Sequence, residues 1–556
     1  MRLHDEGLPE NTIGSMCITH CYRRVSPLKR FRFFVHLAGL TCLVMVVSGC
    51  RMMVGEIHQT QAPATGIATL RPEATTQSTI DELPKRSLTS QKAALLPTSQ
   101  ADLASLRDAP RYTLEVSIGE DLHSYMGQAR VVITNMETLA LESLYFRLLP
   151  NGGSSYGDGR LTVTQTLVDG QPVQTALSLD DSALQVFLKS RLEPGSRVEI
   201  MFDFKGSVPV DFGGDHELYG YGIFNSTQGV LALSGWYPIL AVYDDQGWHL
   251  NPVSAIGDSV YSEMAFYDVT VIAPESLVLV TTGIETSTDA AGGSVRHNLV
   301  SGPARDFFLI ASAGFLVQTQ TVGGTQINSY TLPGDEAAGS IGLGVAAASL
   351  RTFNQHFGQY PYSELDVVEA PMRYALGVEY PEIVLIGETL YANPDDPTFA
   401  VAIAHEVAHQ WWYNLVGNDV YAEPWLDEAL ATYSSGVYYQ DELGEGAYAG
   451  LVSFWQERYD QLRTNGEDDQ ITESLAYFES LSNPSVYSGV VYIKGALFFK
   501  ALREAIGDQA FFAALQRYFA ENKYQVATAD GLLSAFTQTS AKDLDRLYQE
   551  WLYSPR

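Results

Sequence analysis

The sequence predicts a multidomain protein in which an N-terminal antiparallel all-β domain is followed by an α+β domain with a largely helical C-terminal part. Three observations support this prediction. Apolar and polar residues alternate with a period of two over residues 109–317, short strands and a helix are expected after residue 318, and helical patterns dominate from Thr398 onward. Strands that precede helices along the chain are typical of α+β architecture.

The composition of the 556 residues is that of a globular protein, with 46% apolar and 18% charged residues. Acidic residues outnumber basic ones 65 to 34, which gives a net charge of −31. Such a surface repels phosphate backbones, so no nucleic-acid partner is expected. All four cysteines lie within the first 50 residues, so the rest of the chain can form neither a disulfide framework nor a thiolate metal site.

The N-terminus has the features of an export signal. A basic run over residues 23–32 precedes an apolar stretch over residues 33–49, and residues 47–50 read Val-Ser-Gly-Cys. The last four resemble a bacterial lipobox, so residues 1–49 are predicted to be a lipoprotein-type signal peptide and Cys50 the lipidated residue. The alternative is an uncleaved signal anchor. Both predict export and attachment to the outer face of the bacterial cell membrane.

Residues 50–108 are rich in Thr, Ser, Gln, Ala and Pro and predict a disordered tether. The all-β domain is assigned to residues 109–317, and no catalytic constellation is visible in it. The α+β domain is assigned to residues 318–556. There the pattern predicts a helix over residues 337–357 and strands at residues 365–368 and 377–386.

The strongest chemical signal is the pentapeptide His-Glu-Val-Ala-His at residues 405–409. Asp396 suits a helix N-cap and Pro397 the first helical position, and the helix is expected to end near Gly417. Histidines four residues apart lie on one helix face, so both imidazoles can reach one metal ion. Glu406 lies about 100° round the helix, where it can contact a metal-bound water.

A catalytic zinc needs a third protein ligand and an open fourth position. Glu428 is the candidate, on a second helix that Pro424 can begin, and 18 residues separate it from His409. The sequence therefore predicts one Zn²⁺ ion bound by His405, His409 and Glu428. The alternative is a buried helix with two hydrogen-bonded histidines, and the capped helix, the second glutamate and the lack of thiols argue against it.

Residues 405–414 and 425–429 resemble the zinc signature of the M1 metallopeptidases, a gluzincin family that includes aminopeptidase N, at that family's usual gap. The resemblance covers about residues 109–556. It implies an N-terminal β-domain on a thermolysin-like catalytic domain, and a zinc-dependent peptidase activity in which Glu406 is the catalytic base. We expect a short form of the family, without the large helical C-terminal domain that many members have.

Residues 376–380, Leu-Gly-Val-Glu-Tyr, resemble the family's Gly-Ala-Met-Glu-Asn motif, with Tyr380 in place of the asparagine. The resemblance implies that Glu379 binds the free α-amine of a substrate, with Gly377 and Val378 beside it. Pro381 has no N–H donor and predicts an edge strand, which could pair with an extended peptide. The alternative is an exposed strand carboxylate without a role.

Residues 491–496 match the family's Tyr-x-Lys-Gly pattern, so the resemblance implies that Tyr492 is a second catalytic residue, which donates a hydrogen bond to the oxyanion. The residues alone would not rank Tyr492 above Tyr487. Family members often place a Gln or Glu of the β-domain near the substrate amine, and Gln228 is a weak candidate for it.

The predicted function is removal of N-terminal residues from peptides outside the cytoplasmic membrane. One alternative is an endopeptidase or other hydrolase on the same zinc scaffold. Another is a membrane-tethered binding module whose zinc is inert. Glu406 argues against the binding module, because a structural zinc site usually closes its fourth position with a protein ligand and needs no base.

Overall fold

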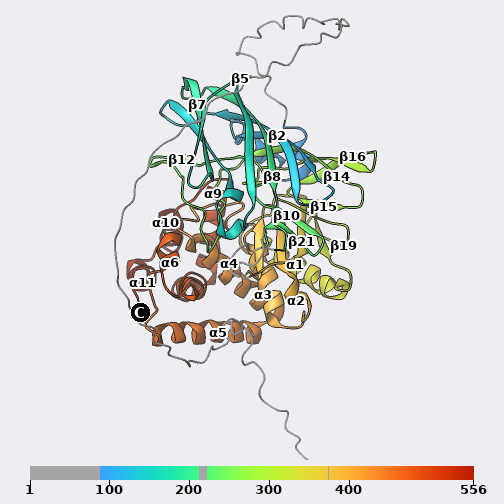
Figure 1. Cartoon of the computed structure of the whole chain (residues 1–556). Coiled ribbons are helices and arrows are strands. Elements are labelled where there is room, and N and C mark those ends of the chain that lie inside the picture. The colour runs from blue at the N-terminus through green and yellow to red at the C-terminus, as the bar shows by residue number, and fades with distance from the viewer. Residues whose placement is uncertain (1–87, 212–221, 374, 556) are drawn as a thin grey trace, which may run out of the picture. The chain divides into compact units, whose positions relative to one another are not determined.

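The computed structural model describes residues 88–211, 222–373 and 375–555 (Figure 1). The predicted signal peptide, Cys50 and residues 50–87 of the predicted tether lie outside this part of the chain. None of the helices in the described ranges is long and apolar enough to span a bilayer.

The prediction of a disordered tether is wrong for residues 88–108, which are ordered. They form the short 3-10 helices η2 (Gln91–Ala94) and η3 (Gln100–Ala104). Four leucines, spread too thinly to stand out in a polar composition, are buried and hold the segment down; they are Leu95, Leu96, Leu103 and Leu106. The segment also bonds to the catalytic part, where the Lys523 ammonium lies 2.7 Å from Asp102 Oδ2.

The β-domain is built on an eight-stranded sheet whose strands follow the order β16-β17-β14-β1-β2-β8-β4-β5. Their bounds are β1 (Arg111–Ile118), β2 (Ser124–Thr134), β4 (Arg160–Val168), β5 (Gln171–Pro172), β8 (Arg197–Ser207), β14 (Phe266–Pro274), β16 (Ile284–Ala291) and β17 (Ser294–Val300). Pairing is antiparallel as predicted, except that β1 and β14 run parallel. Strands far apart in sequence can pair in this way, whereas the alternation pattern does not report direction.

Two four-stranded sheets complete the domain, in the orders β15-β18-β10-β9 and β11-β3-β7-β6, with a small β12-β13 hairpin beside them. The bounds are β3 (Leu141–Arg147), β6 (Thr175–Ser178), β7 (Ala183–Leu192), β9 (Phe224–Thr227), β10 (Val230–Leu233), β11 (Ile239–Leu240), β12 (Tyr243–Asp244), β13 (Gly247–Trp248), β15 (Val278–Thr281) and β18 (Leu309–Ser312). Alternate residues of these strands and of the large sheet share one hydrophobic core, which explains the period of two in the sequence.

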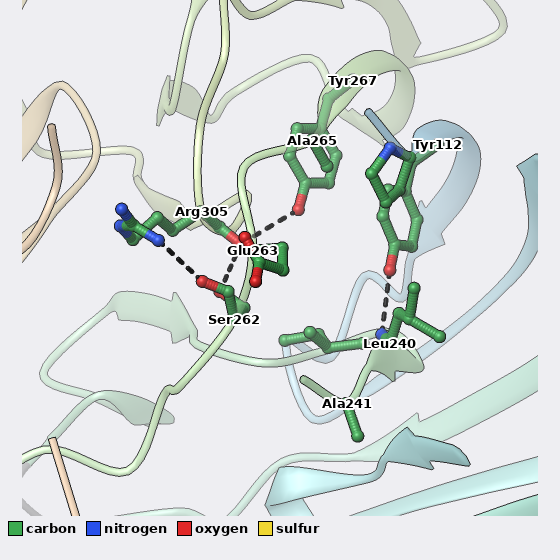
Figure 2. A pocket seen from close by; sticks show the side chains of 10 residues that line it. Tyr112, Leu240, Ala241, Ser262, Glu263, Ala265, Tyr267 and Arg305 are labelled. Carbon is green, nitrogen blue, oxygen red and sulfur yellow. Dashed lines mark hydrogen bonds between the residues drawn. The ribbon is translucent and has the colours of Figure 1, made fainter. Parts of the chain in front are cut away.

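A small hollow in the β-domain is lined by aromatic and aliphatic side chains and, at one end, by Ser262, Glu263 and Arg305 (Figure 2). Tyr112 and Tyr267 form its aromatic wall. None of the predicted catalytic, metal-binding or substrate-binding residues lines this hollow.

The catalytic part begins with a five-stranded sheet of order β19-β20-β21-β23-β22. Its strands are β19 (Leu316–Val322), β20 (Thr325–Thr331), β21 (Glu364–Ala370), β22 (Gly377–Tyr380) and β23 (Ile383–Gly387). The sheet therefore starts two residues before the predicted boundary at 318. The predicted helix over 337–357 is confirmed as α1 (Glu336–His356), and the predicted strand at 365–368 as β21.

The prediction of one strand over 377–386 is wrong, because the chain reverses at Pro381 and Glu382 to form the β22-β23 hairpin. Glu382 has a φ of 69°, a conformation that is uncommon for glutamate and that the sequence therefore does not predict. The prediction of an edge strand is confirmed, since β22 is the last strand of the sheet.

Helices form the rest of the catalytic part: α2 (Glu388–Tyr391), α3 (Pro397–Ala408), α4 (Trp425–Tyr438), α5 (Glu445–Thr464), α6 (Leu475–Glu479), α7 (Ser485–Tyr487), α8 (Gly495–Ile506), α9 (Asp508–Asn522), α10 (Ala529–Ser540) and α11 (Asp545–Trp551). Two π-helical segments, η6 (Tyr439–Leu443) and η7 (Ser488–Lys494), interrupt them. All residues of α4 are buried, which makes it the central helix, packed against α3 and α8.

Candidate active site

Helix α3 carries the His-Glu-Val-Ala-His pentapeptide and begins as predicted. The Asp396 side chain accepts a hydrogen bond of 2.9 Å from the Thr398 N–H, and Pro397 occupies the first helical position. The expected end near Gly417 is wrong, because the helix stops at Ala408 and His409 is its C-cap.

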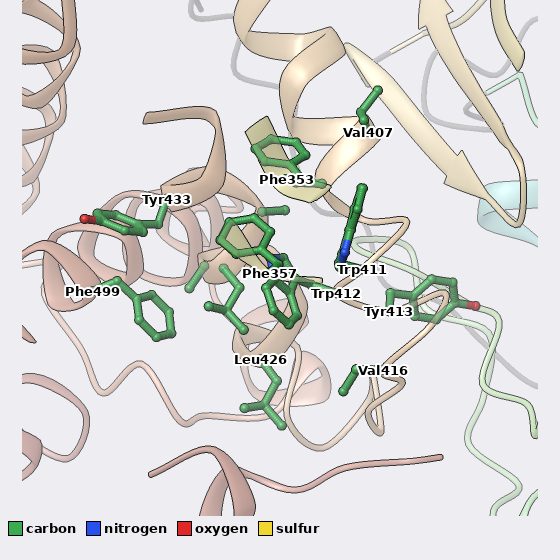
Figure 3. Packing of buried hydrophobic residues seen from close by; sticks show 14 of the residues in the cluster. Phe353, Phe357, Val407, Trp411, Trp412, Tyr413, Val416, Leu426, Tyr433 and Phe499 are labelled. Carbon is green, nitrogen blue, oxygen red and sulfur yellow. The ribbon is translucent and has the colours of Figure 1, made fainter. Parts of the chain in front are cut away.

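The helix ends early because the chain makes a compact turn over residues 409–416, in which Tyr413 has a φ of 109°. Two buried indoles of this turn pack against α1 and its C-cap: Trp411 contacts Phe353, and Trp412 contacts Phe357 (Figure 3). Burial of both indoles stabilises the turn in place of two further helical turns.

The turn fixes the second histidine. His409 Nδ1 donates to the Trp412 carbonyl at 3.0 Å, and the Asn414 N–H donates to the His409 carbonyl at 3.0 Å. A proton held on Nδ1 leaves Nε2 as the free ligand atom, which is the usual arrangement of a metal-binding imidazole.

Three ligand atoms from α3 and α4 converge on one point. His405 Nε2 and His409 Nε2 lie 3.0 Å apart, and Glu428 Oε2 lies 3.2 Å and 3.3 Å from them. A tetrahedral zinc with bonds of about 2.0–2.2 Å would hold its ligand atoms about 3.3–3.6 Å apart. The three side chains therefore fit a zinc ion with only a few tenths of an ångström of expansion.

The charges of the site favour a cation. Burial alone raises the pKa of Glu428, but hydrogen bonds with His405 and His409 outweigh it and lower the pKa to about 2. Burial also lowers the pKa of His405. At His409 burial acts in the same direction, but the charges of Glu379 and Glu428 outweigh it and raise the pKa well above its usual range. A carboxylate beside a neutral imidazole is the ligand form that a metal requires.

A second group of ligand atoms, from Glu379, Glu406 and His409, also lies within 4.8 Å. Because His409 donates its Nδ1 proton to Trp412, this residue offers a single nitrogen. The two groups therefore cannot both hold an ion.

Glu406 is buried beside the ligand cluster but belongs to no ligand triangle with His405 and Glu428. Burial, with the negative charge of Glu379 as a second cause, raises the pKa of Glu406 well above its usual range. Gly377 makes room for this side chain, since a Cβ there would lie 2.4 Å from the Cγ and Oε1 of Glu406. Gly377 is thus placed against the predicted catalytic base.

Tyr492 comes to the ligand cluster from the π-helical segment η7. Its hydroxyl donates to Glu428 Oε1, and its ring stacks on His405 with centroids 5.7 Å apart. The Tyr487 ring packs edge-on against the Tyr492 ring, with centroids 5.6 Å apart. Of the two tyrosines, Tyr492 is the one whose ring stacks on His405. π-Helical turns often occur at functional sites, and here the turn aims Tyr492 at the ligands.

Lys494 anchors the end of η7. Its fully buried ammonium lies 2.9 Å from Asp468 Oδ1 and donates to the Ser554 carbonyl at 3.0 Å.

Glu379 lies on β22 and faces the cluster, with Oε1 3.7 Å from His409 Nδ1. It is 7% exposed, so the alternative of an exposed strand carboxylate is wrong. Val378 stands beside it and is half-buried. The structure therefore brings Gly377, Val378 and Glu379 together with the ligand cluster at the edge of the sheet.

Tyr380, which stands in place of the asparagine of the family motif, packs against the β-domain. Its ring is buried and stacks on Phe308 of the β-domain, with centroids 3.8 Å apart and planes at 7°. Gln410, the residue after His409, donates to the Tyr380 carbonyl and accepts from the Glu382 N–H, both at 2.9 Å. The β22-β23 hairpin is thus tied directly to the turn after α3.

Sequence reasoning missed Asp258, a half-buried residue on the loop between β13 and β14. Burial, with the negative charge of Glu379 as the second cause, raises the pKa of Asp258 well above the usual range. The catalytic part holds this loop, since Tyr421 and Tyr413 donate to the Ser259 and Val260 carbonyls at 2.9 Å and 2.8 Å. A Gly-Asp-Ser loop gives no signal in the sequence that would single it out.

Gln228, the weak candidate from the β-domain, is not brought to the cluster. It is exposed in the β9-β10 turn, where its side-chain amide donates to Glu388 Oε1 at 2.9 Å.

Comparison with known proteins shows that this chain is similar to M1 peptidases. Residues 341–551 match the model of the peptidase family M1 domain. Aminopeptidase M1-B of Oryza sativa subsp. japonica is 27% identical over 248 residues, which is 42% of this chain and 28% of that protein. The puromycin-sensitive aminopeptidase of Caenorhabditis elegans is 22% identical over 468 residues, 81% of this chain and 47% of that protein. The chain thus spans about half or less of these relatives.

Among solved structures, the crystal structure of an M1 zinc metallopeptidase from Deinococcus radiodurans is similar with a TM-score of 0.59 and 19% identity. The match covers 81% of this chain and 95% of that one. A mutant of the same enzyme, solved with a Tyr-Ser-Ala substrate, matches with a TM-score of 0.59 and 18% identity. These matches confirm the fold class, a β-domain followed by a mixed α/β catalytic part with a helical end.

Proposed function

Because this chain carries a peptidase M1 domain over residues 341–551, we propose that it is a zinc-dependent aminopeptidase. Its proposed substrates are peptides with a free amino terminus. The observation that carries the proposal is the convergence of His405, His409 and Glu428, with the unligated Glu406 beside them and Glu379 at the adjoining sheet edge. The tripeptide bound to a structural relative supports a peptide as the substrate class.

His405, His409 and Glu428 would hold the zinc, which supplies Lewis-acid polarisation of the scissile carbonyl and of water when bound. Glu406 is the proton carrier of the site. Its buried carboxylate takes a proton from the attacking water and later delivers it to the leaving amine.

Tyr492 and Glu379 act on the two ends of the reacting residue. Burial raises the pKa of Tyr492 far above neutrality, so its phenol keeps a proton to donate to the developing oxyanion. Glu379 pairs with the substrate ammonium, and the open edge of β22 can bond the extended peptide backbone. A carboxylate at a fixed distance from the scissile bond limits cleavage to the first residue.

We also propose that the protein is exported and held at the outer face of the bacterial membrane, through a lipid on Cys50 or through an uncleaved signal anchor. The basic and apolar runs before Cys50 support this location. Mass spectrometry of the N-terminal peptide from membranes tests it. An unmodified Cys50 within an intact apolar segment would favour the anchor, and recovery of the protein in the cytoplasm would contradict both.

Aminoacyl-coumarin substrates, with and without an N-acetyl group, test the proposed activity before and after chelation and zinc restoration. We expect cleavage of the free substrates only, loss of activity on chelation and recovery with zinc. Glu406→Gln should abolish turnover while zinc stays bound. Equal cleavage of acetylated peptides would instead indicate an endopeptidase, and zinc binding without any turnover would indicate the binding module.

A further inference from the structure

Arg305 lies between β17 and β18 and carries a guanidinium that is buried among four backbone carbonyls, three of which belong to the catalytic part. Its Nε donates to the Tyr413 and Asn414 carbonyls at 2.7 Å and 3.1 Å, and its Nη2 donates to the Gln525 carbonyl at 2.7 Å. Its Nη1 donates to the Ser262 carbonyl at 2.9 Å. No carboxylate of the described residues forms an ion pair with it. Burial of a cation is costly, so this carbonyl cage is a specific feature of the fold.

One of the residues that Arg305 binds, Tyr413, has a strained backbone. Tyr413 has a φ of 109°, a backbone angle that residues other than glycine rarely adopt. All its polar groups are bonded: its N–H donates to the Val416 carbonyl at 2.8 Å, its hydroxyl donates to the Val260 carbonyl at 2.8 Å, and its carbonyl accepts from Arg305. A strained backbone conformation persists only where neighbouring groups stabilise it, and Arg305 is one of these groups.

Tyr413 separates the two residues that fix His409. Before it in the chain, the Trp412 carbonyl accepts the Nδ1 proton of His409, and after it the Asn414 N–H donates to the His409 carbonyl. A change in the backbone of Tyr413 therefore moves both partners of the histidine. Partners of this kind orient a metal-binding imidazole, and their loss typically weakens metal binding about 10- to 100-fold.

We propose that Arg305 is a positioning residue for His409, and that the zinc affinity of the protein depends on it. This inference rests on the zinc site of the proposed function. Ser262 and Tyr267 of the β-domain donate to the Arg305 carbonyl at 2.6 Å and 3.3 Å, so the β-domain sets where the guanidinium lies (Figure 2). The docking of the β-domain thereby contributes to the affinity of a metal site that contains none of its residues.

Gly417 offers a second way to disturb the same contact. A Cβ on it would lie 2.1 Å from Arg305 Cζ, and its φ is not in the left-handed region. Gly417→Ala therefore displaces the far end of a flexible side chain without straining its own backbone. Arg305→Lys acts from the other side, since an ammonium keeps the charge but cannot reproduce the planar fork that reaches these carbonyls.

The test is the zinc dissociation constant of the full chain, measured by competition with a chromogenic chelator, beside urea unfolding of the metal-free protein. We expect Arg305→Lys and Gly417→Ala each to weaken zinc binding about 10- to 100-fold. Arg503→Lys is the matched control, because Arg503 is also buried but bonds Asp508, Gln440 and Tyr433, away from the turn. Gly344→Ala is the second control, since a Cβ there meets no atom within 4 Å.

The outcomes separate this inference from the proposed function. Zinc binding within about threefold of wild type in Arg305→Lys would overturn the inference, as would an equal loss in Arg503→Lys, which would mark a general effect of stability. If Arg305→Lys does not fold, Gly417→Ala decides the matter by the same criterion. A wild-type protein that takes up no zinc would overturn the proposed function itself, before any variant is compared.

Discussion

Gly377→Ala gives a direct test of the geometry assigned to the catalytic base. The added Cβ would lie 2.4 Å from Cγ and Oε1 of Glu406 and 2.5 Å from its Cδ, whereas ordinary contacts begin at 3.4 Å. The carboxylate must therefore retreat by about 1 Å. A misplacement of about 1 Å costs on the order of 100-fold in rate, so we expect kcat to fall about 100-fold.

The assay is steady-state hydrolysis of a free aminoacyl-coumarin, with zinc content measured on the same samples. Zinc should remain bound, because the three atoms nearest to the added Cβ all belong to Glu406, which is not one of the proposed zinc ligands. Gly344→Ala on α1 is the control, for it adds the same methyl group in open space and should leave kcat unchanged. A kcat within about threefold of wild type, with zinc bound, would refute the assignment of Glu406 as the base.

Four further predictions follow from the same structure. Tyr492→Phe should lower kcat about 100- to 1,000-fold with little change in KM, measured by steady-state kinetics, because an oxyanion donor is removed; an unchanged kcat would exclude that role. Glu379→Ala should lower kcat/KM for free substrates far more than for acetylated ones, and equal losses would contradict ammonium binding. Lys494→Met should destabilise the protein by about 3–5 kcal/mol in urea unfolding, because it leaves Asp468 buried without its cation; a loss below about 1 kcal/mol would contradict this. Burial, with the charge of Glu379, raises the pKa of Asp306 from 3.8 to about 7. Between these values the folded protein holds a proton that the unfolded chain releases, so the free energy of unfolding falls as the pH rises. Asp306→Asn should reduce that slope by up to about 1.4 kcal/mol per pH unit in urea unfolding, and an unchanged slope would show that Asp306 is ionised when folded.

The sequence was most informative where chemistry depends on local periodicity. Two histidines four residues apart must share a helix face, and Asp396 with Pro397 marks where that helix begins, so the ligand face of α3 could be predicted. Pro381 likewise predicted the edge position of β22. In each case a few neighbouring residues determine the result.

Prediction from the sequence failed where tertiary contacts override local preference. The end of α3 is set by the burial of Trp411 and Trp412 against α1, and nothing in residues 409–417 alone forbids two more helical turns. Residues 88–108 were predicted to be disordered because a composition average conceals four well-placed leucines. The placement of Asp258 and Arg305 depends on contacts made more than 100 residues away in the chain.

The same contacts bear on whether the β-domain is a separate binding module. A separate binding module would contact the catalytic part through a surface that does not include the turn over residues 409–416. Instead, Arg305 donates to a carbonyl of the turn after His409, Phe308 stacks on the residue after Glu379, and the charge of Glu379 raises the pKa of Asp258. Arg305 and Phe308 lie on the β17-β18 loop and Asp258 lies on the β13-β14 loop, and all three are near residues that flank the metal ligands or near the proposed substrate carboxylate. The β-domain therefore contributes structurally to the candidate active site, and changes at its interface with the catalytic part should first be assayed by zinc affinity and turnover.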